Sequence, residues 1–128
     1  MVPIESEADI VTARQRGRTL GAEVGFRAGE LALIATAISE LARNIVLYAG
    51  RGEILLTKIS EGGRIGLLIA ASDQGPGISD LTQAMRDGFS TSGGLGLGLP
   101  GVKRLMDEFG VVSSPGRGTT VTAKKWKR

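Results

Sequence analysis

Residues 28–49 have the sequence AGELALIATAISELARNIVLYA, and this apolar stretch decides the fold. Its large aliphatic side chains recur at helical spacing, at Leu31, Ile34, Ile38, Leu41 and Ile45. Other apolar residues between them widen the surface, so we expect a long helix that is largely buried. Gly50 and Gly52 follow the stretch and are predicted to end it.

Two polar side chains, Glu40 and Asn44, interrupt this apolar helix. They are four residues apart, so they share one helix face. A carboxylate and an amide buried there need partners. One interpretation is a pair of ordinary solvent-facing residues. The other is a site in which Asn44 offers its carbonyl oxygen to a divalent ion and Glu40 orients or deprotonates a nucleophile. Magnesium fits, since it needs few protein ligands beside phosphate and water.

A hairpin and a glycine-rich loop follow the helix. Residues 53–60 and 65–72 are aliphatic and β-branched, and residues 61–63 between them predict a tight turn. Asp73 leaves the second strand and begins the stretch Asp73-Gln-Gly-Pro-Gly77. Its carboxylate can accept a hydrogen bond from an exocyclic amine such as that of adenine. Gly75 and Gly77 would let the backbone approach a flat ring, although a simple polar turn also explains this stretch.

A second glycine-rich loop alternates with leucines just before another expected helix. Gly94, Gly96 and Gly98 can turn several backbone amides toward one point, and the start of a helix favours phosphate. A glycine count alone would favour a flexible linker. The alternating large aliphatics argue against a linker and favour a phosphate-binding loop.

The remaining pattern predicts one α+β domain, residues 1–128, built as a two-layer sandwich. Asp9 is a candidate helix cap, and Gly25 is a candidate stop for the same helix. The other expected elements are a strand at 2–6, a short helix at 80–86, a helix at 97–109, and strands at 111–114 and 119–126 joined by a turn at 115–118.

Composition excludes several kinds of chemistry. The 128 residues contain no cysteine and no histidine, which excludes disulfides, thiolate sites and a phosphohistidine on this chain. We see no signal peptide and no apolar run that we expect to span a bilayer, so the expected location is cytoplasmic, with no membrane partner. Phosphate-binding motifs of P-loop proteins, of dinucleotide-binding folds and of eukaryotic-type protein kinases are absent.

The net charge of +3 gathers at the C-terminus, in Lys124, Lys125, Lys127 and Arg128. We favour a solvated terminal strand and tail over an acidic partner or a nucleic acid. Only Trp126 interleaves with these basic residues, so nucleic-acid binding is an unfavoured interpretation.

Taken together, the motifs resemble the GHKL superfamily of ATPases and kinases. Glu40-Leu-Ala-Arg-Asn44 is similar to its N box, Asp73 to Gly77 to its G1 box, Gly94 to Gly98 to its G2 box, and Gly118-Thr119 to its final adenine-side motif. The resemblance implies the Bergerat fold, in which helices cover one face of a mixed sheet and a mobile lid joins the G1 and G2 boxes.

Residues 37–44, 87–94 and 99–109 narrow the resemblance to the RsbT-type serine/threonine kinases of the bacterial stressosome. This resemblance implies phosphorylation of STAS-domain proteins, namely an RsbS-like antagonist and an RsbR-like scaffold. It also implies that the released kinase activates an RsbU-type serine phosphatase. Since the chain has no phosphoacceptor histidine, the acceptor must come from another molecule.

The resulting hypothesis is a kinase that depends on ATP and Mg²⁺, in which Glu40 is the catalytic base and Asn44 the metal ligand. Asp73 would select adenine, and Thr119 would support it directly or through water. The other residues expected around the nucleotide are Gly75, Gly77, Gly94, Gly96, Gly98 and, on a lid at 89–92, Ser90 and Thr91. The alternative hypothesis is a nucleotide-gated binding module, such as an anti-sigma factor, with little or no kinase activity.

Overall fold

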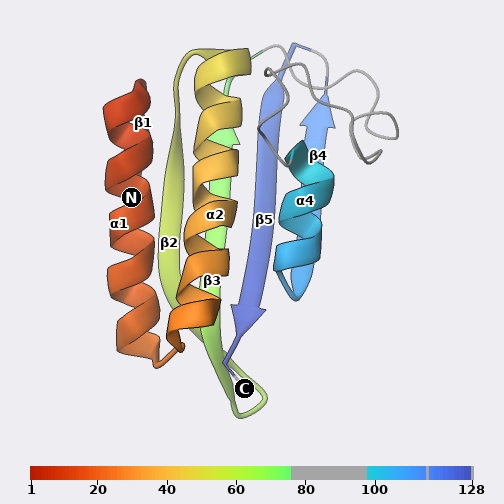
Figure 1. Cartoon of the computed structure of the whole chain (residues 1–128). Helices are drawn as coiled ribbons and strands as arrows, with labels where there is room; N and C mark the ends of the chain where they lie inside the picture. The colour runs from red at the N-terminus through yellow and green to blue at the C-terminus, as the bar shows by residue number, and fades with distance from the viewer. Residues whose placement is uncertain (76–97, 115, 128) are drawn as a thin grey trace.

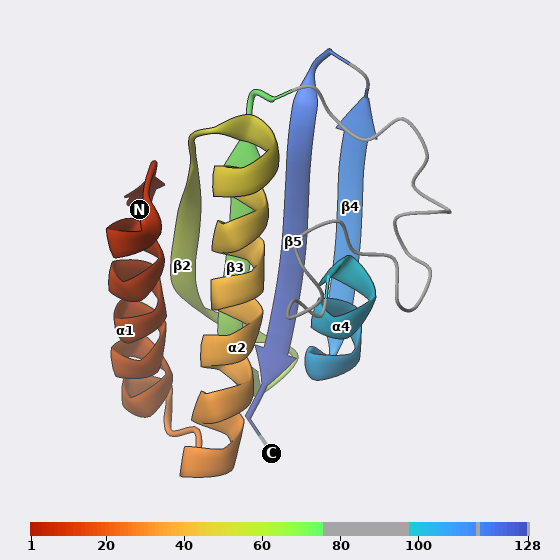
Figure 2. The same ribbon diagram turned by 45° about the horizontal axis from the view of Figure 1, so that its top comes forward.

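The structure is a computed structural model that describes residues 1–75, 98–114 and 116–127. Its elements are β1 (Val2–Ile4), α1 (Glu7–Val24), α2 (Ala28–Asn44), the π-helix η1 (Ile45–Ala49), β2 (Gly52–Glu61), β3 (Arg64–Asp73), α4 (Gly98–Leu105), β4 (Glu108–Ser114) and β5 (Gly118–Trp126). Helices α1, α2 and α4 lie side by side on one face of the sheet (Figures 1 and 2). This arrangement confirms the predicted two-layer α+β sandwich.

The sheet has the strand order β1-β2-β3-β5-β4. All four pairings in the described part of the chain are antiparallel, so the mixed sheet that the resemblance implied is wrong for this part. The physical reason is the position of β5. Strands β3 and β4 run in the same direction, but β5 lies between them and pairs with both.

The predicted hairpin is confirmed and is longer than expected. Strands β2 and β3 pair over ten residues each, from Gly52 opposite Asp73 to Glu61 opposite Arg64. The turn consists of Gly62 and Gly63, with φ angles of 57° and 81°. Two successive positive φ angles define the turn whose twist matches that of the flanking strands, and glycine adopts them without strain.

Helix α1 begins at Glu7 with Ser6 as its N-cap residue, so the prediction that Asp9 caps it is wrong. Asp9 lies in the first turn, where its Oδ2 accepts the Glu5 N–H at 2.8 Å. The predicted stop at Gly25 is confirmed, because this residue has a φ of 108° and its N–H bonds back to the helix.

The helix predicted at residues 28–49 is confirmed in extent, with its last five residues in the wider π form. Ala28–Ala49 contains an 18-residue window with a mean hydropathy of 1.4, so by length and composition it could span a bilayer, contrary to our expectation. Half of that window is buried inside the protein, and Ile34, Ile38 and Leu41 are among the buried residues. We therefore interpret it as the core helix of the sandwich.

Helix α4 ends at Leu105, so the prediction of a helix reaching Phe109 is wrong. Tertiary contacts end it early: the buried Lys125 donates its Nζ to the Leu105 carbonyl at 3.1 Å. The Asp107 N–H then donates to the Lys124 carbonyl at 2.9 Å, which starts the pairing of β4 with β5. A helical spacing of apolar residues could not reveal this pairing, which depends on a distant strand.

Candidate functional site

Glu40 lies near the end of α2, on the face that packs into the protein. The residue is only 6% exposed. Its Oε1 accepts a hydrogen bond from Arg43 Nη1 at 2.9 Å, one helical turn along. The neighbouring Ser39 is also buried and donates its hydroxyl to the Ala35 carbonyl at 2.8 Å. The first interpretation of Glu40, as an ordinary solvent-facing residue, is therefore wrong.

Asn44 is the last residue of α2 and is partly buried. Directly after it the helix widens into η1, where the Gly50 N–H donates to the Ile45 carbonyl at 2.9 Å. Such π-helical turns are rare and often occur at functional sites. Asn44 thus lies where α2 passes into η1, one turn beyond Glu40.

Asp73 lies on the helix-covered face of the sheet, at the end of β3. Side chains alternate along a strand, and Leu67, Ile69 and Ala71 are buried toward the helices. Asp73 continues this series by two residues, so it faces the same layer as Glu40 and Asn44. The sequence could place Asp73 at a strand end but not on this face.

A row of residues crosses the sheet at this end. Asp73 lies opposite Gly52 on one side and Thr119 on the other, and Thr119 lies opposite Ser113. Residues directly opposite on antiparallel strands share a face, so Asp73, Thr119 and Ser113 all face the helices. This register brings together the two predicted adenine-side residues, which are 46 positions apart in the sequence.

Gly75 is held close to both Asp73 and the end of η1. Its N–H donates to Asp73 Oδ1 at 2.9 Å. A Cβ added at Gly75 would lie 2.6 Å from the Ala49 Cβ, which is closer than two carbon atoms can pack. Glycine is thus required here by the neighbouring helix end. The contact uses one oxygen of Asp73, and a carboxylate accepts hydrogen bonds at two.

Thr119 has a hydroxyl partner that sequence reasoning missed. Its Oγ1 lies 2.8 Å from Ser113 Oγ, and Ser113 Oγ also lies 3.2 Å from the Gly118 carbonyl, to which it donates. Because a hydroxyl has one proton, Thr119 is then the donor in the pair, and its remaining lone pairs can accept. The alternation of β4, in which Val112 is 75% exposed, is the signal that places Ser113 inward.

Gly118 brings the start of β5 against Asp73. A Cβ added there would overlap the Asp73 carbonyl oxygen, and the residue has a φ of 86°. Gly116 has a similar φ of 79°, but a Cβ added there meets no described atom within 4 Å. The two glycines therefore have similar φ angles, but only Gly118 lacks room for a Cβ.

We expect Gly118→Ala to lower the free energy of unfolding more than Gly116→Ala does. The left-handed conformation costs an alanine about 1–2 kcal/mol at either position. Overlap with backbone adds about 1–3 kcal/mol at Gly118 alone. Urea unfolding followed by the fluorescence of Trp126, the single tryptophan, measures both losses. Equal losses would show that the approach to Asp73 does not constrain residue 118.

Comparisons with known proteins agree with this geometry. Residues 29–128 match the family described as "Histidine kinase-, DNA gyrase B-, and HSP90-like ATPase". Serine/threonine-protein kinase RsbT of Bacillus subtilis (strain 168) is 59% identical over 127 residues, which is 99% of this chain and 96% of that protein. The chain belongs to this ATPase family. The predicted resemblance to RsbT-type kinases, and with it the prediction of an ATP-dependent serine/threonine-protein kinase, is confirmed.

More distant similarities are to an anti-sigma factor and to two solved structures. An anti-sigma F factor of Thermoanaerobacter sp. (strain X514) is 34% identical over 103 residues, or 76% of this chain and 71% of that protein. The mycobacterial sensor histidine kinase MprB has a TM-score of 0.58 at 21% identity, covering 98% of this chain and 97% of that one. ShkA in complex with AMPPNP has a TM-score of 0.57 at 23% identity, covering 96% of this chain and 30% of ShkA. The two solved structures establish the fold.

Some predicted ATPase residues lie outside the described residues. They are Gly77, Ser90, Thr91, Gly94 and Gly96, together with the lid at 89–92 and the short helix at 80–86. Gly98 is described: it is the first residue of α4, with a φ of 65°. Among the described residues no group of three or more acidic side chains could hold a metal ion. The role of Asn44 as metal ligand stays a prediction.

The basic C-terminal strand is occupied by structural contacts. Lys124 Nζ donates to Glu61 Oε2 at 2.9 Å, and this hydrogen bond raises the pKa of Lys124. Lys125 is buried and reaches the Leu105 carbonyl at the end of α4. Two of the basic side chains thus join elements of the fold, which disfavours nucleic-acid binding. Because Lys125 is buried, the prediction of a solvated strand is wrong at this residue.

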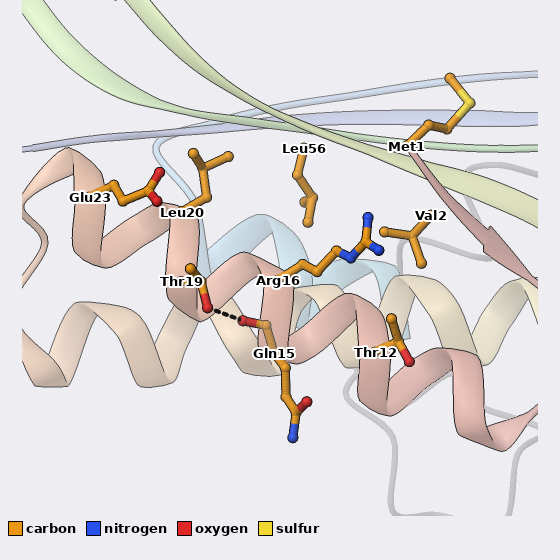
Figure 3. Close-up of a pocket in the computed structure, with 9 residues that line it drawn as sticks. All are labelled: Met1, Val2, Thr12, Gln15, Arg16, Thr19, Leu20, Glu23 and Leu56. Atoms are coloured by element: carbon orange, nitrogen blue, oxygen red, sulfur yellow. Dashed lines mark hydrogen bonds between the residues drawn. The ribbon is translucent and has the colours of Figure 1, made fainter.

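A separate pocket of about 490 Å³ lies between α1 and the edge of the sheet (Figure 3). Its apolar lining comes from Met1, Val2, Leu20 and Leu56, and its charged lining from Arg16 and Glu23. It shares no residue with the candidate ATP site, and we assign it no role in the family's chemistry.

Proposed function

We propose that the chain binds Mg·ATP and transfers the γ-phosphate to a serine or threonine of another protein. What supports the proposal is that residues from three separate motifs meet at one end of the fold. Asp73 and Thr119 are directly opposite on the helix-covered face, and Glu40 and Asn44 end the helix packed on that face. One end of such a site suits a purine and the other a metal-bound triphosphate.

In this proposal Asp73 accepts a hydrogen bond from the adenine amine, with Thr119 and Gly75 beside it. Asn44 offers its side-chain oxygen to Mg²⁺, which suits a cation that takes few protein ligands. When bound, the metal would neutralise charge on the phosphates. The start of α4 at Gly98 suits the phosphates, because a helix N-terminus favours anions. Gly77, Gly94 and Gly96 complete the loops, with Ser90 and Thr91 on the lid.

Glu40 acts on the acceptor hydroxyl. Its carboxylate takes the proton as the hydroxyl oxygen forms a bond to the γ-phosphorus. The bond from that phosphorus to the bridging oxygen breaks, and ADP leaves. The acceptor comes from a second protein, because the chain has no histidine and Ser39, next to Glu40, is buried.

We propose the partners from the family resemblance. The phosphoacceptors are STAS-domain proteins, an RsbS-like antagonist and an RsbR-like scaffold, in a stressosome of the cytoplasm. On release the kinase activates an RsbU-type phosphatase. The 59% identity to RsbT over 99% of the chain is the support for these finer assignments.

The proposal is tested by incubating the purified chain with γ-labelled ATP, Mg²⁺ and the two STAS-domain proteins. We expect label on a serine or threonine of the acceptor and none on the kinase itself. The same reaction without the acceptor is the control. Complexes that form with nucleotide but carry no label would contradict the kinase.

A second candidate function is a nucleotide-gated binding module with little or no kinase activity. The 34% identity to an anti-sigma F factor over 76% of the chain favours it. It predicts that nonhydrolysable ATP supports all partner binding and that no phosphate is transferred. The labelling experiment therefore separates the two functions.

We expect Asn44→Ala to remove the magnesium dependence of ATP binding. The parent should lose about tenfold in ATP affinity when Mg²⁺ is replaced by a chelator, and the variant should show the lower affinity in both conditions. Asn44→Asp keeps an oxygen ligand at the same place and should restore the dependence. Titration calorimetry measures all three proteins. A variant that still responds to Mg²⁺ like the parent would exclude Asn44 as the ligand.

A further inference from the structure

Arg43 forms an ion pair with the Glu40 carboxylate, and none of the family motifs assigns it a role. Arg43 Nη1 donates to Glu40 Oε1 at 2.9 Å. The side chain of Glu40 is 8% exposed, and that of Arg43 is 36% exposed. One member of this ion pair is thus inside the protein while the other reaches the surface.

The helix geometry places Arg43 over Glu40. Side chains three and four residues apart share a helix face, and they lean toward the N-terminus of the helix. The Arg43 side chain therefore extends back from the last turn of α2 across Glu40. Asn44, four residues after Glu40, lies on the same helix face. The three polar residues thus share one turn at the C-terminal end of α2, which is otherwise apolar.

The pair differs from an ordinary surface ion pair. Exposed pairs contribute little, because water screens both charges. A buried carboxylate loses its water and needs charged hydrogen-bond donors in return. Arg43 supplies such a donor and also fixes a side chain whose terminal torsion is otherwise broad. With Oε1 held, the direction of the whole carboxylate is set before a substrate arrives.

We infer that Arg43 is a positioning residue for the transfer reaction, which holds the Glu40 carboxylate in the orientation that receives the hydroxyl proton. The inference rests on the proposed function of Glu40. Arg43 acts through Glu40 and needs no contact with nucleotide or acceptor.

The first test is the effect of Arg43→Gln and Arg43→Lys on saturated transfer. We expect Arg43→Gln to lower kcat by about tenfold with the KM for ATP unchanged, because misplacing a catalytic group slows the step without weakening nucleotide binding. Arg43→Lys keeps the charge and should recover part of kcat. Arg18→Gln removes the same charge from an exposed position on α1 and should leave kcat unchanged. An Arg43→Gln enzyme with the parent kcat would overturn the inference.

The second test is a double-mutant cycle. If Arg43 acts through Glu40, then Arg43→Gln in a Glu40→Ala background should change the residual rate by less than about twofold. A further tenfold loss in that background would show that Arg43 acts independently, and would overturn the inference while leaving Glu40 as the base. If Glu40→Ala alone transfers at the parent rate, the proposed function of Glu40 fails and the inference fails with it.

Measurements of stability distinguish a positioning role of Arg43 from a purely structural one. Urea unfolding of each variant, followed by Trp126 fluorescence, shows whether the fold is intact under assay conditions. Arg43→Lys, which retains a cation for the buried carboxylate, is the variant expected to stay folded. A kcat of Arg43→Lys equal to that of the parent, with Arg43→Gln unstable, would mean that Arg43 only neutralises charge and would overturn the inference.

Discussion

Glu40→Ala is expected to slow phosphate transfer by roughly 10²–10⁴-fold, the contribution that a well-placed general base makes. Glu40 is buried on α2, one turn from Asn44, whereas the predicted adenine-side residues Asp73 and Thr119 lie on strands β3 and β5. The affinity for Mg·ATP should therefore stay close to that of the parent. Single-turnover transfer to the acceptor measures the rate, and calorimetry measures the affinity.

The control for this prediction is Glu40→Gln, which keeps the size of the side chain and can still pair with Arg43 but cannot take a proton. It should be as slow as Glu40→Ala. In Glu40→Ala the released Arg43 side chain, which is 36% exposed, can be solvated, and in Glu40→Gln it keeps an amide partner, so both variants should remain folded. If Glu40→Gln transfers phosphate at the parent rate, Glu40 is not the base.

Asp73→Asn is expected to weaken ATP binding by about tenfold to a hundredfold, since a hydrogen bond to a charged group contributes roughly 1.5–3 kcal/mol. The amide keeps the shape of the side chain and one acceptor oxygen, so the Gly75 N–H bond can form as before. The substitution removes the negative charge of the group that would accept the hydrogen bond from the adenine amine. Calorimetric titration with Mg·ATP measures the loss.

Thr119→Val is the matched variant for this end of the site. It removes the hydroxyl that pairs with Ser113 at 2.8 Å while leaving the carboxylate of Asp73 in place. We expect it to weaken ATP binding less than Asp73→Asn does. Asp73→Asn with the parent affinity would remove Asp73 from its proposed role.

Local chemistry made part of the fold predictable. Glycines at positions that need positive φ gave the stop at Gly25 and the hairpin turn at Gly62 and Gly63. Periodic apolar residues gave the long helix at 28–49 in full. These features depend on neighbours in the sequence, so the sequence carries them.

The features that were mispredicted depend on contacts between distant segments. The end of α4 is set by Lys125 and by the pairing of β4 with β5. The antiparallel sheet follows from the insertion of β5 between β3 and β4, which periodicity does not encode. The same insertion places Ser113 beside Thr119, so this hydroxyl pair could be found only from the register.

The residues of the candidate site were predicted from their chemical types. Their positions relative to one another follow from the strand order and register of the sheet. Each motif alone had a plain alternative: a polar turn, a linker or a solvent-facing helix. The burial of Glu40 removes the solvent-facing alternative. The opposition of Asp73 and Thr119 suits a shared site, while the Gly75 N–H bond to Asp73 is also the contact that a polar turn makes. The role inferred for Arg43 could not be predicted from the motif, because it depends on the 2.9 Å distance between Arg43 Nη1 and Glu40 Oε1.

The central claim is that Asp73 accepts a hydrogen bond from adenine at one end of the site. The other end binds the metal-bound phosphates of the same nucleotide. Titration calorimetry of the parent chain with Mg·ATP and with Mg·GTP tests this claim most directly. Adenine offers an amine where guanine has a carbonyl, and a carboxylate accepts only from the amine. We expect clear binding of ATP and markedly weaker binding of GTP. No heat with ATP, or equal affinity for both nucleotides, would contradict the account.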